Sequence, residues 1–338
     1  MSAVAARLTG ASPGGRLHLQ HGPIDLIIEA FGAAAEVERA YGQAIDRFGD
    51  ILPTLVRELP TLRRSIGTAY PLLQGPVARR MANAVWPHRA VYITPMAAVA
   101  GAVADEMLQA LVAGRTLDKA YVNDGGDIAI HLTPGHELRA GIFAESLDGL
   151  ARLTFDQPVR GLATSGRGGR SFSCGIADSA TVLAATAAAA DAAATLIANA
   201  VDVDHPAIER RPARDLDPDS DLGDLPVTVA VGKLPQALID EALDRGVTEA
   251  RRLRLCGLIE GAALSLFGQW RIDASRALAT LTSPFSRRLD RSAKRGAERP
   301  SLPDKPHMGK KRSLRSGFQP SVETTEMCDS SKLSRSVK

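Results

Sequence analysis

The stretch from Gly161 to Asp202 constrains the fold of this chain most strongly, because its sequence predicts two strands, a glycine-rich loop and a long helix in succession. The run Val159–Thr164 is apolar and indicates the first strand. Ala180–Ala185 is β-branched at its centre and bounded by small residues, so it predicts the second. Thr186 is a suitable N-cap for an alanine-rich helix that we expect to end near Val201. The intervening loop contains Gly166, Arg167, Gly168, Gly169 and Arg170.

Asp191 and Thr195 lie four residues apart on this predicted helix and are therefore neighbours on one face, and Asn199 continues the same polar line. A carboxylate and a hydroxyl arranged in this way beside a glycine-rich loop can hold a hard cation next to a phosphate. The alternative is a solvated polar stripe on a helix whose alanines reflect helix propensity. The spacing by itself favours this alternative, because short motifs match often by chance.

A second cluster of candidate site residues lies in a predicted β-hairpin, in which Lys119–Asn123 and Ile128–Leu132 flank the turn Asp124-Gly125-Gly126-Asp127. Turn chemistry alone explains the glycines, since glycine adopts positive φ without steric cost. It does not explain why Asn123, Asp124 and Asp127 gather there, and these side chains are candidates to bind the amide or hydroxyl edge of a ligand. Upstream, Pro95 fits the start of a helix over Met96–Val112, whose small side chains permit either tight packing or the close approach of a flat ligand.

Hairpins and long helices alternate along the rest of the chain. We therefore predict an α+β fold of antiparallel hairpins packed with helices, and not a parallel doubly wound sheet. The further expected elements are strands at Arg16–Gln20, Ile24–Ala30, Val91–Thr94, Arg139–Ala144, Val227–Val231, Ala262–Phe267 and Gln269–Ile272, and helices at Ala33–Phe48 and Pro235–Arg254.

Two further polar features are expected to have no role in a site. His88 lies beside Pro87 in a connector, where an exposed loop histidine is the ordinary outcome. Five aspartates lie between Asp215 and Asp224, but the glycine and the terminal bidentate acid of a calcium loop are missing. We interpret this run as a solvated acidic loop.

Composition and charge divide the chain into three parts. After Ser275 lie 15 of the 41 Lys and Arg residues but only 6 of the 38 Asp and Glu residues. The preceding part of the chain is therefore acidic. The basic excess is thus confined to one terminal segment, and we expect no nucleic-acid partner. We predict a flexible segment over residues 1–15, one α+β domain over residues 16–273, and a basic, disordered tail over residues 274–338, where apolar periodicity ends.

The expected compartment is the cytoplasm. Three cysteines in 338 residues give no disulfide framework, which suits a reducing environment. The first 15 residues have no basic start followed by an apolar core, so we expect no signal peptide. No run of 18 consecutive apolar residues occurs, so we expect no membrane span.

Several short motifs together resemble those of the ApbE-like superfamily, whose best-known members are magnesium-dependent FAD:protein FMN transferases. These motifs are ATSG at Ala163–Gly166, ADSATVLA at Ala177–Ala184 and ADAAAT at Ala190–Thr195. The run Asn123–Ile128 resembles the flavin-site hairpin of the superfamily, and Met96–Gly101 is closer to an uncharacterised cytosolic branch. The resemblance extends over roughly Leu17 to Ile272 and implies an ApbE-like, T-fold-related α+β architecture.

This resemblance implies a site for FAD or FMN together with Mg²⁺, with Asp191 and Thr195 as metal ligands. The backbone N–H groups of Ser165–Gly169 would hold phosphate, with Arg167 or Arg170 nearby. In the transferases, the FMN moiety passes to a Thr or Ser hydroxyl of an acceptor flavoprotein, and AMP leaves. The implied flavin-site residues are Met96, Gly101, Asn123, Asp124, Gly125, Gly126, Asp127, Thr164, Ser165 and Gly166.

One departure from the superfamily leaves the activity open. The transferases carry a His-containing stretch before the second strand, whereas Ser171–Asp178 contains neither His nor Pro, and its nearest polar substitutes are Ser173, Cys174 and Asp178. Loss of a general base typically costs orders of magnitude in rate. Three functions therefore remain: an enzyme that transfers FMN or hydrolyses the FAD pyrophosphate, a flavin-binding or carrier protein without turnover, and an unrelated reaction on the same fold.

Overall fold

Nine strands form one continuous sheet in the order β1-β2-β3-β4-β5-β8-β9-β12-β13, and every neighbouring pair is antiparallel. The computed structural model describes residues 3–275, except 9, 11, 13, 145, 146 and 170, together with Val322 and Glu323. The strands of the sheet are β1 Val4–Leu8, β2 Arg16–His21, β3 Ile24–Gly32, β4 Leu117–Asp124, β5 Asp127–Leu132, β8 Gly161–Ser165, β9 Ser179–Ala184, β12 Gly261–Leu266 and β13 Gln269–Ala274. The predicted antiparallel α+β class is confirmed.

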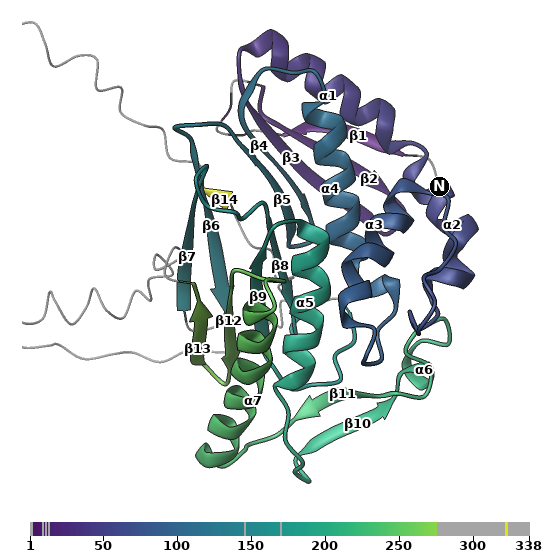
Figure 1. Cartoon of the computed structure of the whole chain (residues 1–338), viewed down its shortest axis with the longest axis vertical. Helices are drawn as coiled ribbons and strands as arrows, with labels where there is room; N and C mark the ends of the chain where they lie inside the picture. Colours follow the sequence, from purple (N-terminus) through teal and green to yellow (C-terminus); the bar gives the residue numbers. More distant parts are fainter. Residues whose placement is uncertain are drawn as a thin grey trace, which may run out of the picture.

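The long helices cover one face of this sheet (Figure 1). From one end of the sheet to the other, α1 packs on β3, α4 on β4 and β5, α5 on β8 and β9, and α7 on β12 and β13. Apolar side chains buried between the helices and the sheet form the main core. The helices are α1 Ala34–Phe48, α2 Ile51–Leu62, α3 Pro76–Val85, η1 Trp86–His88, η2 Pro95–Ala98, α4 Val99–Val112, α5 Ala187–Ala200, α6 Ala213–Leu216 and α7 Gln236–Leu255.

The opposite face of the sheet is partly covered by a second hairpin, formed by β6 (Glu137–Ala144) and β7 (Leu147–Thr154) (Figure 1). Leu138 and Leu153 of this hairpin are buried with Ile128 and Leu162 of the main sheet in a smaller core. The two-residue strand β14 (Val322–Glu323) pairs with β6. A separate two-stranded sheet, β10 (Ile208–Pro212) with β11 (Pro226–Val231), lies beyond the end of α5 (Figure 1).

Local structure differs from the sequence prediction in a few places. Val91–Thr94 forms no strand, because it connects η1 to η2 without a neighbouring strand to pair with. β1 lies in the segment expected to be flexible, and β7 and β10 were not predicted. Each of these strands is stabilised by pairing with a partner and carries no strong apolar alternation of its own. The tail predicted over residues 274–338 lies outside the described residues, except for residues 274, 275, 322 and 323.

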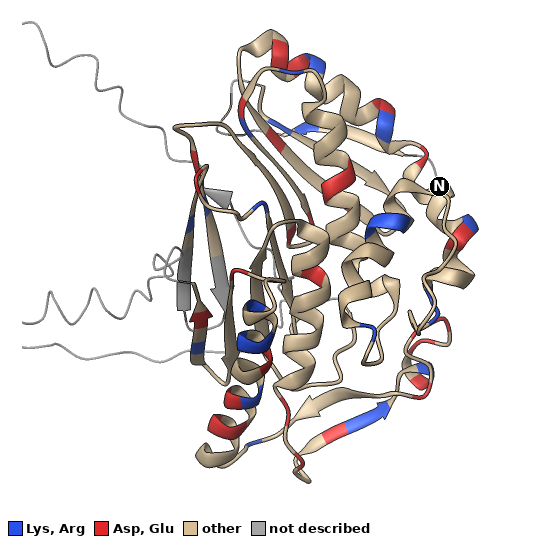
Figure 2. Cartoon of the chain, in the orientation of Figure 1, with Lys and Arg blue, Asp and Glu red and all other residues tan. Residues whose placement is uncertain are grey.

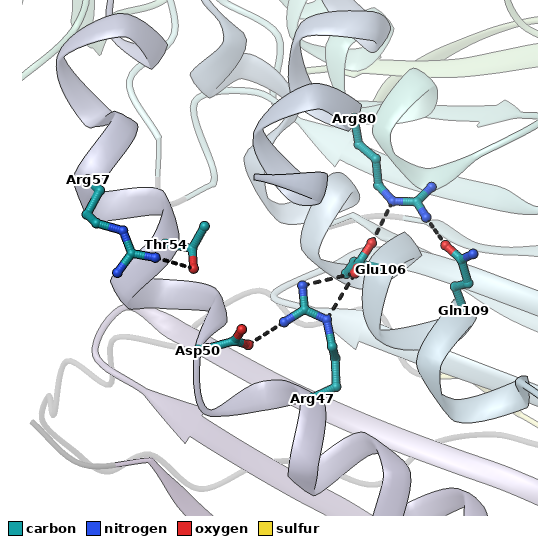
Figure 3. A network of polar contacts seen from close by, with 7 residues as sticks. All are labelled: Arg47, Asp50, Thr54, Arg57, Arg80, Glu106 and Gln109. Carbon is teal, nitrogen blue, oxygen red and sulfur yellow. Dashed lines mark hydrogen bonds and ion pairs between the residues drawn. The ribbon is translucent and has the colours of Figure 1, made fainter. Parts of the chain in front are cut away.

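Helix α4 is fixed between α1 and α3 by a network of ion pairs around Glu106, a residue that is only 11% exposed (Figure 3). Glu106 accepts hydrogen bonds from Arg47 of α1 and Arg80 of α3, both at 3.0 Å. The helix is apolar enough that Pro95–Val112 meets the length and hydropathy of a membrane span, the one such helix in the described part of the chain. Within the fold, residues such as Val103 and Met107 of this helix are fully buried in the main core.

Candidate functional site

Helices α4 and α5 cross in direct backbone contact at Gly101. A Cβ atom at this position would lie 2.3 Å from the carbonyl oxygen of Ala187, so only glycine permits the two helices to approach this closely. Gly161 of β8 likewise permits close contact between the sheet and the start of α5, because a Cβ atom there would lie 2.0 Å from the carbonyl carbon of Thr186. The first turn of α5 is therefore held against both α4 and β8.

Each of the two crossing helices caps the other. Asp105 of α4 accepts the backbone N–H groups of Ala187 and Ala188 at 3.0 and 2.9 Å, and these N–H groups belong to the first turn of α5. Asp191 of α5 accepts the N–H of Gly101, in the first turn of α4, at 3.0 Å. Both carboxylates thus satisfy N–H groups that have no partner within their own helix.

Asp191 is the single ionisable residue on α5, a helix that is otherwise uncharged (Figure 2). Its negative charge is unfavourable in the ligand-free protein. Burial is the main cause that raises the pKa of this carboxyl to about 7, and the charges of Asp124 and Asp105 add to it. The N–H groups of Gly101 and Ala100 act in the opposite direction. Because three carboxylates share one poorly solvated region, a cation bound there would stabilise the ionised form of Asp191.

A cavity of about 930 Å³ runs along the polar face of α5. Asp191, Thr195 and Asn199 line it on successive turns, so the predicted polar stripe faces this cavity. The volume lies within the range of small-molecule sites and is large enough for a nucleotide ligand. The other residues singled out from the sequence that line it are Met96, Asp127, Thr164, Ser165, Gly166, Gly169 and Cys174.

Of the residues predicted at the β4–β5 turn, only Asp127 lines the cavity among the described residues, and positions 123–126 do not. Gly125 and Gly126 have φ of 63° and 121°, and Asn123 Oδ1 accepts the N–H of Gly126 at 2.8 Å, so these residues serve the turn itself. Asp124 is 4% exposed at the end of β4. Asp127 accepts the N–H of Thr164 at 3.2 Å, which joins the turn to β8. Among the described residues, the cavity lining includes Asp127 but not positions 123–126 or Gly101.

The loop between β8 and β9 uses most of its polar groups internally. Arg167 pairs with Asp178 and lies over the ring of Phe267, 5.6 Å from its centroid, and it is not among the described residues that line the cavity. Asp178 also accepts the N–H of Phe267 at 2.5 Å. The N–H of Cys174 donates to Asn199 Oδ1 at 3.0 Å, which ties this loop to α5. Arg170 lies outside the described residues.

Two features expected to have no role line the same cavity. His88 is 5% exposed, and the prediction of an exposed loop residue is therefore wrong. The acidic loop is not simply solvated, because Asp221 accepts a hydrogen bond from Thr94 and its carbonyl oxygen accepts one from Tyr92 at 2.7 Å. No local pattern indicates either contact, since the bonded residues are more than 120 positions apart in the sequence.

The residues present fit a hard cation only in part. A carboxylate and a hydroxyl, Asp191 and Thr195, line the cavity on adjacent turns, and oxygen donors of this kind suit Mg²⁺. Within the described residues no group of three or more His, Cys, Asp and Glu is arranged to hold a metal. Any such site must therefore be completed by backbone carbonyls, water or oxygens of a ligand.

Comparison with known proteins gives a match over most of the described domain. A family model described as AbpE bacteria matches residues 7–272. A UPF0280 protein of Methanothrix thermoacetophila is 40% identical over 134 residues, which cover 38% of this chain and 54% of that protein. A UPF0280 protein of Methanopyrus kandleri is 32% identical over 181 residues, covering 53% of this chain and 68% of that protein. The chain thus spans about half the length of the first relative and about two thirds of the second.

Solved structures are more distant. The flavin transferase ApbE from Vibrio cholerae is 12% identical with a TM-score of 0.39, over 83% of this chain and 100% of that chain. The apo form of the flavinyl transferase ApbE from Pseudomonas stutzeri is 13% identical with a TM-score of 0.34, over 83% of this chain and 98% of that chain.

Proposed function

Because this chain belongs to the AbpE bacteria family, as its motifs predict, we propose that it binds FAD with Mg²⁺ in the cavity along α5 and cleaves the FAD pyrophosphate. The nucleophile is either a Thr or Ser hydroxyl of an acceptor flavoprotein, which then receives FMN, or water. AMP is the second product in both cases. We assign this activity to the cytoplasm on the cysteine content of the chain. The observation that carries the proposal is that Asp191 and Thr195 line the same cavity as Asp127 and the turn after β8.

Asp191 and Thr195 would hold the metal, and Asp191 is held in position by its hydrogen bond from Gly101. A bound Mg²⁺ supplies Lewis-acid stabilisation of the charge that develops on the pyrophosphate oxygens. Because two protein ligands are too few for Mg²⁺, the site is completed by phosphate oxygens, water and backbone carbonyls. Metal and dinucleotide should therefore bind with positive coupling.

The turn after β8 would contact the phosphates. The N–H groups of Arg167 and Gly169 already donate to the carbonyl oxygens of Ala177 and Gly166, at 2.9 and 3.0 Å. We therefore assign a phosphate contact to the N–H group of Gly166, which lines the cavity. Gly166 has a φ of 138°, which favours glycine at this position.

A flavin-binding protein without turnover is the second candidate. The observation that favours it is the loop Ser171–Asp178, which has no histidine and whose Cys174 and Asp178 make hydrogen bonds within the protein. Such a site would retain the cofactor contacts of the family and lack the group that activates the nucleophile. Purified protein would then carry bound flavin and release no AMP.

The proposal is tested by incubating purified protein with FAD and Mg²⁺ and separating the products by chromatography. Release of AMP and FMN in equal amounts indicates hydrolysis. Release of AMP with flavin covalently attached to added flavoprotein indicates transfer. Tight FAD binding without AMP favours the second candidate. If calorimetry detects no binding of FAD or FMN with or without Mg²⁺, both candidates are wrong.

A further inference from the structure

His88 is a buried and unpaired histidine at the wall of the proposed flavin cavity. Its side chain is 5% exposed, and its Nδ1 atom has no hydrogen-bond partner in the described part of the chain. An unpaired buried polar atom costs free energy unless a ligand or water satisfies it. His88 is among the residues that line the cavity, so it lies beside any ligand bound there.

The turn that carries His88 is held rigidly by its neighbours. Trp86, at the start of η1, packs edge-on against Tyr70 with their ring centroids 5.2 Å apart. The guanidinium of Arg89 lies 4.7 Å from the centroid of the Trp86 ring and donates to the Trp86 carbonyl oxygen at 3.0 Å. The residues on both sides of Pro87-His88 are therefore fixed, which positions the imidazole before a ligand binds.

The charges around His88 favour a neutral ring. Burial is the main cause that lowers the pKa of His88, and the charge of Arg252 on α7 lowers it further, whereas Glu249 acts in the opposite direction. Arg252 and Glu249 also pair with each other, at 2.6 and 2.8 Å, so the net charge that α7 presents is small. A neutral imidazole has one nitrogen able to accept a proton. The other charged groups lining the cavity are Arg63, Asp127, Asp191, Asp217, Asp219 and Asp221.

We propose that His88 is the proton acceptor for the nucleophile in this cavity. The Ser171–Asp178 loop contains no histidine that could take this role. The inference rests on the proposed cleavage of FAD. A hydroxyl or water oxygen forms a bond to the FMN phosphorus, and its proton passes to the imidazole of His88. The bond between that phosphorus and the bridging oxygen breaks, and AMP leaves with the electron pair. No oxidant or reductant is required.

The test compares His88→Gln with the wild type and with His131→Gln. His131 is a suitable control because burial also lowers its pKa, but it lies on β5 and is not among the residues that line the cavity. We expect His88→Gln to lower the rate of AMP release about 10²- to 10⁴-fold, as for loss of a general base, with FAD affinity changed by less than about threefold. His131→Gln should keep the wild-type rate.

A second variant and a spectroscopic measurement distinguish loss of the proton acceptor from loss of folding. His88→Ala should regain AMP release when imidazole is added, in proportion to imidazole concentration and with unchanged melting temperature. In protein with isotope-labelled histidine rings, FAD added without Mg²⁺ should shift the His88 resonance and leave the His131 resonance in place.

The outcomes separate this inference from the proposed function. If His88→Gln releases AMP at the wild-type rate, His88 is not the proton acceptor and the proposed function stands. If the wild type binds FAD without releasing AMP, the inference is wrong and the carrier function stands. If the wild type does not bind FAD at all, both are wrong.

Discussion

Asp105 and Asp191 lie on two crossing helices, and each accepts N–H groups from the first turn of the helix that carries the other. This reciprocal capping links the position of the proposed metal ligand to the packing of α4 against α5. It also gives the Asp191 carboxyl group a hydrogen-bond partner on a helix that carries no other ionisable side chain. The position of the proposed metal ligand Asp191 therefore depends on the packing of α4 against α5 in the core.

Asp105→Asn should destabilise the ligand-free protein by about 1–2 kcal/mol, because one amide oxygen cannot serve both N–H groups at the start of α5. Chemical denaturation measures the change. The same substitution at Asp118, which is exposed on β4, should have little effect. Equal stability of both variants with the wild type would show that the cap contributes nothing.

Gly101→Ala should separate α4 from α5, because its methyl group would lie 2.3 Å from the Ala187 carbonyl oxygen. We expect a loss of about 1–3 kcal/mol of stability, as for overpacking in a core. The matched control is Gly42→Ala in α1, where no atom lies within 4 Å of the added methyl group. That change should stabilise the protein by about 0.5–1 kcal/mol, because alanine favours the helix. A Gly101→Ala variant as stable as the wild type would contradict the described crossing.

Asp191→Asn and Thr195→Val should each weaken Mg²⁺-dependent FAD binding by about 10- to 100-fold, the range found when groups around a bound metal are removed. Asn retains an oxygen for the Gly101 N–H but removes the charge, and Val retains the volume but removes the hydroxyl. Calorimetric titration with and without Mg²⁺ provides the measurement, with the exposed Asp244→Asn as the control. Wild-type affinity in both site variants would show that the α5 stripe binds no metal.

Stability should fall as the pH is lowered below 6.5, in part because of His88. Its pKa in the folded protein lies below the ordinary value of 6.5, so the unfolded chain takes up the proton first. The folded state therefore gains stability from His88 above pH 6.5, and this stability is lost on acidification. Denaturation with urea between pH 5 and 8 should show a flatter profile for His88→Gln. A profile parallel to the wild type would mean that His88 is protonated equally in both states.

Truncation after Ser275 should leave the domain intact. The segment that follows carries the basic excess of the chain and little apolar periodicity. Its described part, Val322–Glu323, pairs with β6 over two residues only. The melting temperature of the truncated protein should lie within about 3 °C of that of the full chain. A larger loss would show that the tail contributes to the fold.

Local rules in the sequence were sufficient for much of the architecture. Gly22-Pro23 between alternating strands predicts the β2–β3 hairpin, and the glycine pair Gly125-Gly126 predicts the β4–β5 turn with its positive φ. Thr186 predicts the start of α5, and its hydroxyl accepts the N–H of Ala189 at 3.1 Å. Each of these predictions depends on residues within a few positions of one another, where backbone preference dominates.

The sequence also determined that Asp191 and Thr195 share one helix face, and the family motifs predicted a site along that helix. Only the tertiary structure decided what surrounds this face. The capping of α5 by Asp105 and the contact of Asp221 with Thr94 join segments 83 and 127 positions apart. His88 is likewise buried by the tertiary structure. Such contacts depend on how whole helices and loops pack, because burial and long-range hydrogen bonds leave no periodic signal in the segments that make them.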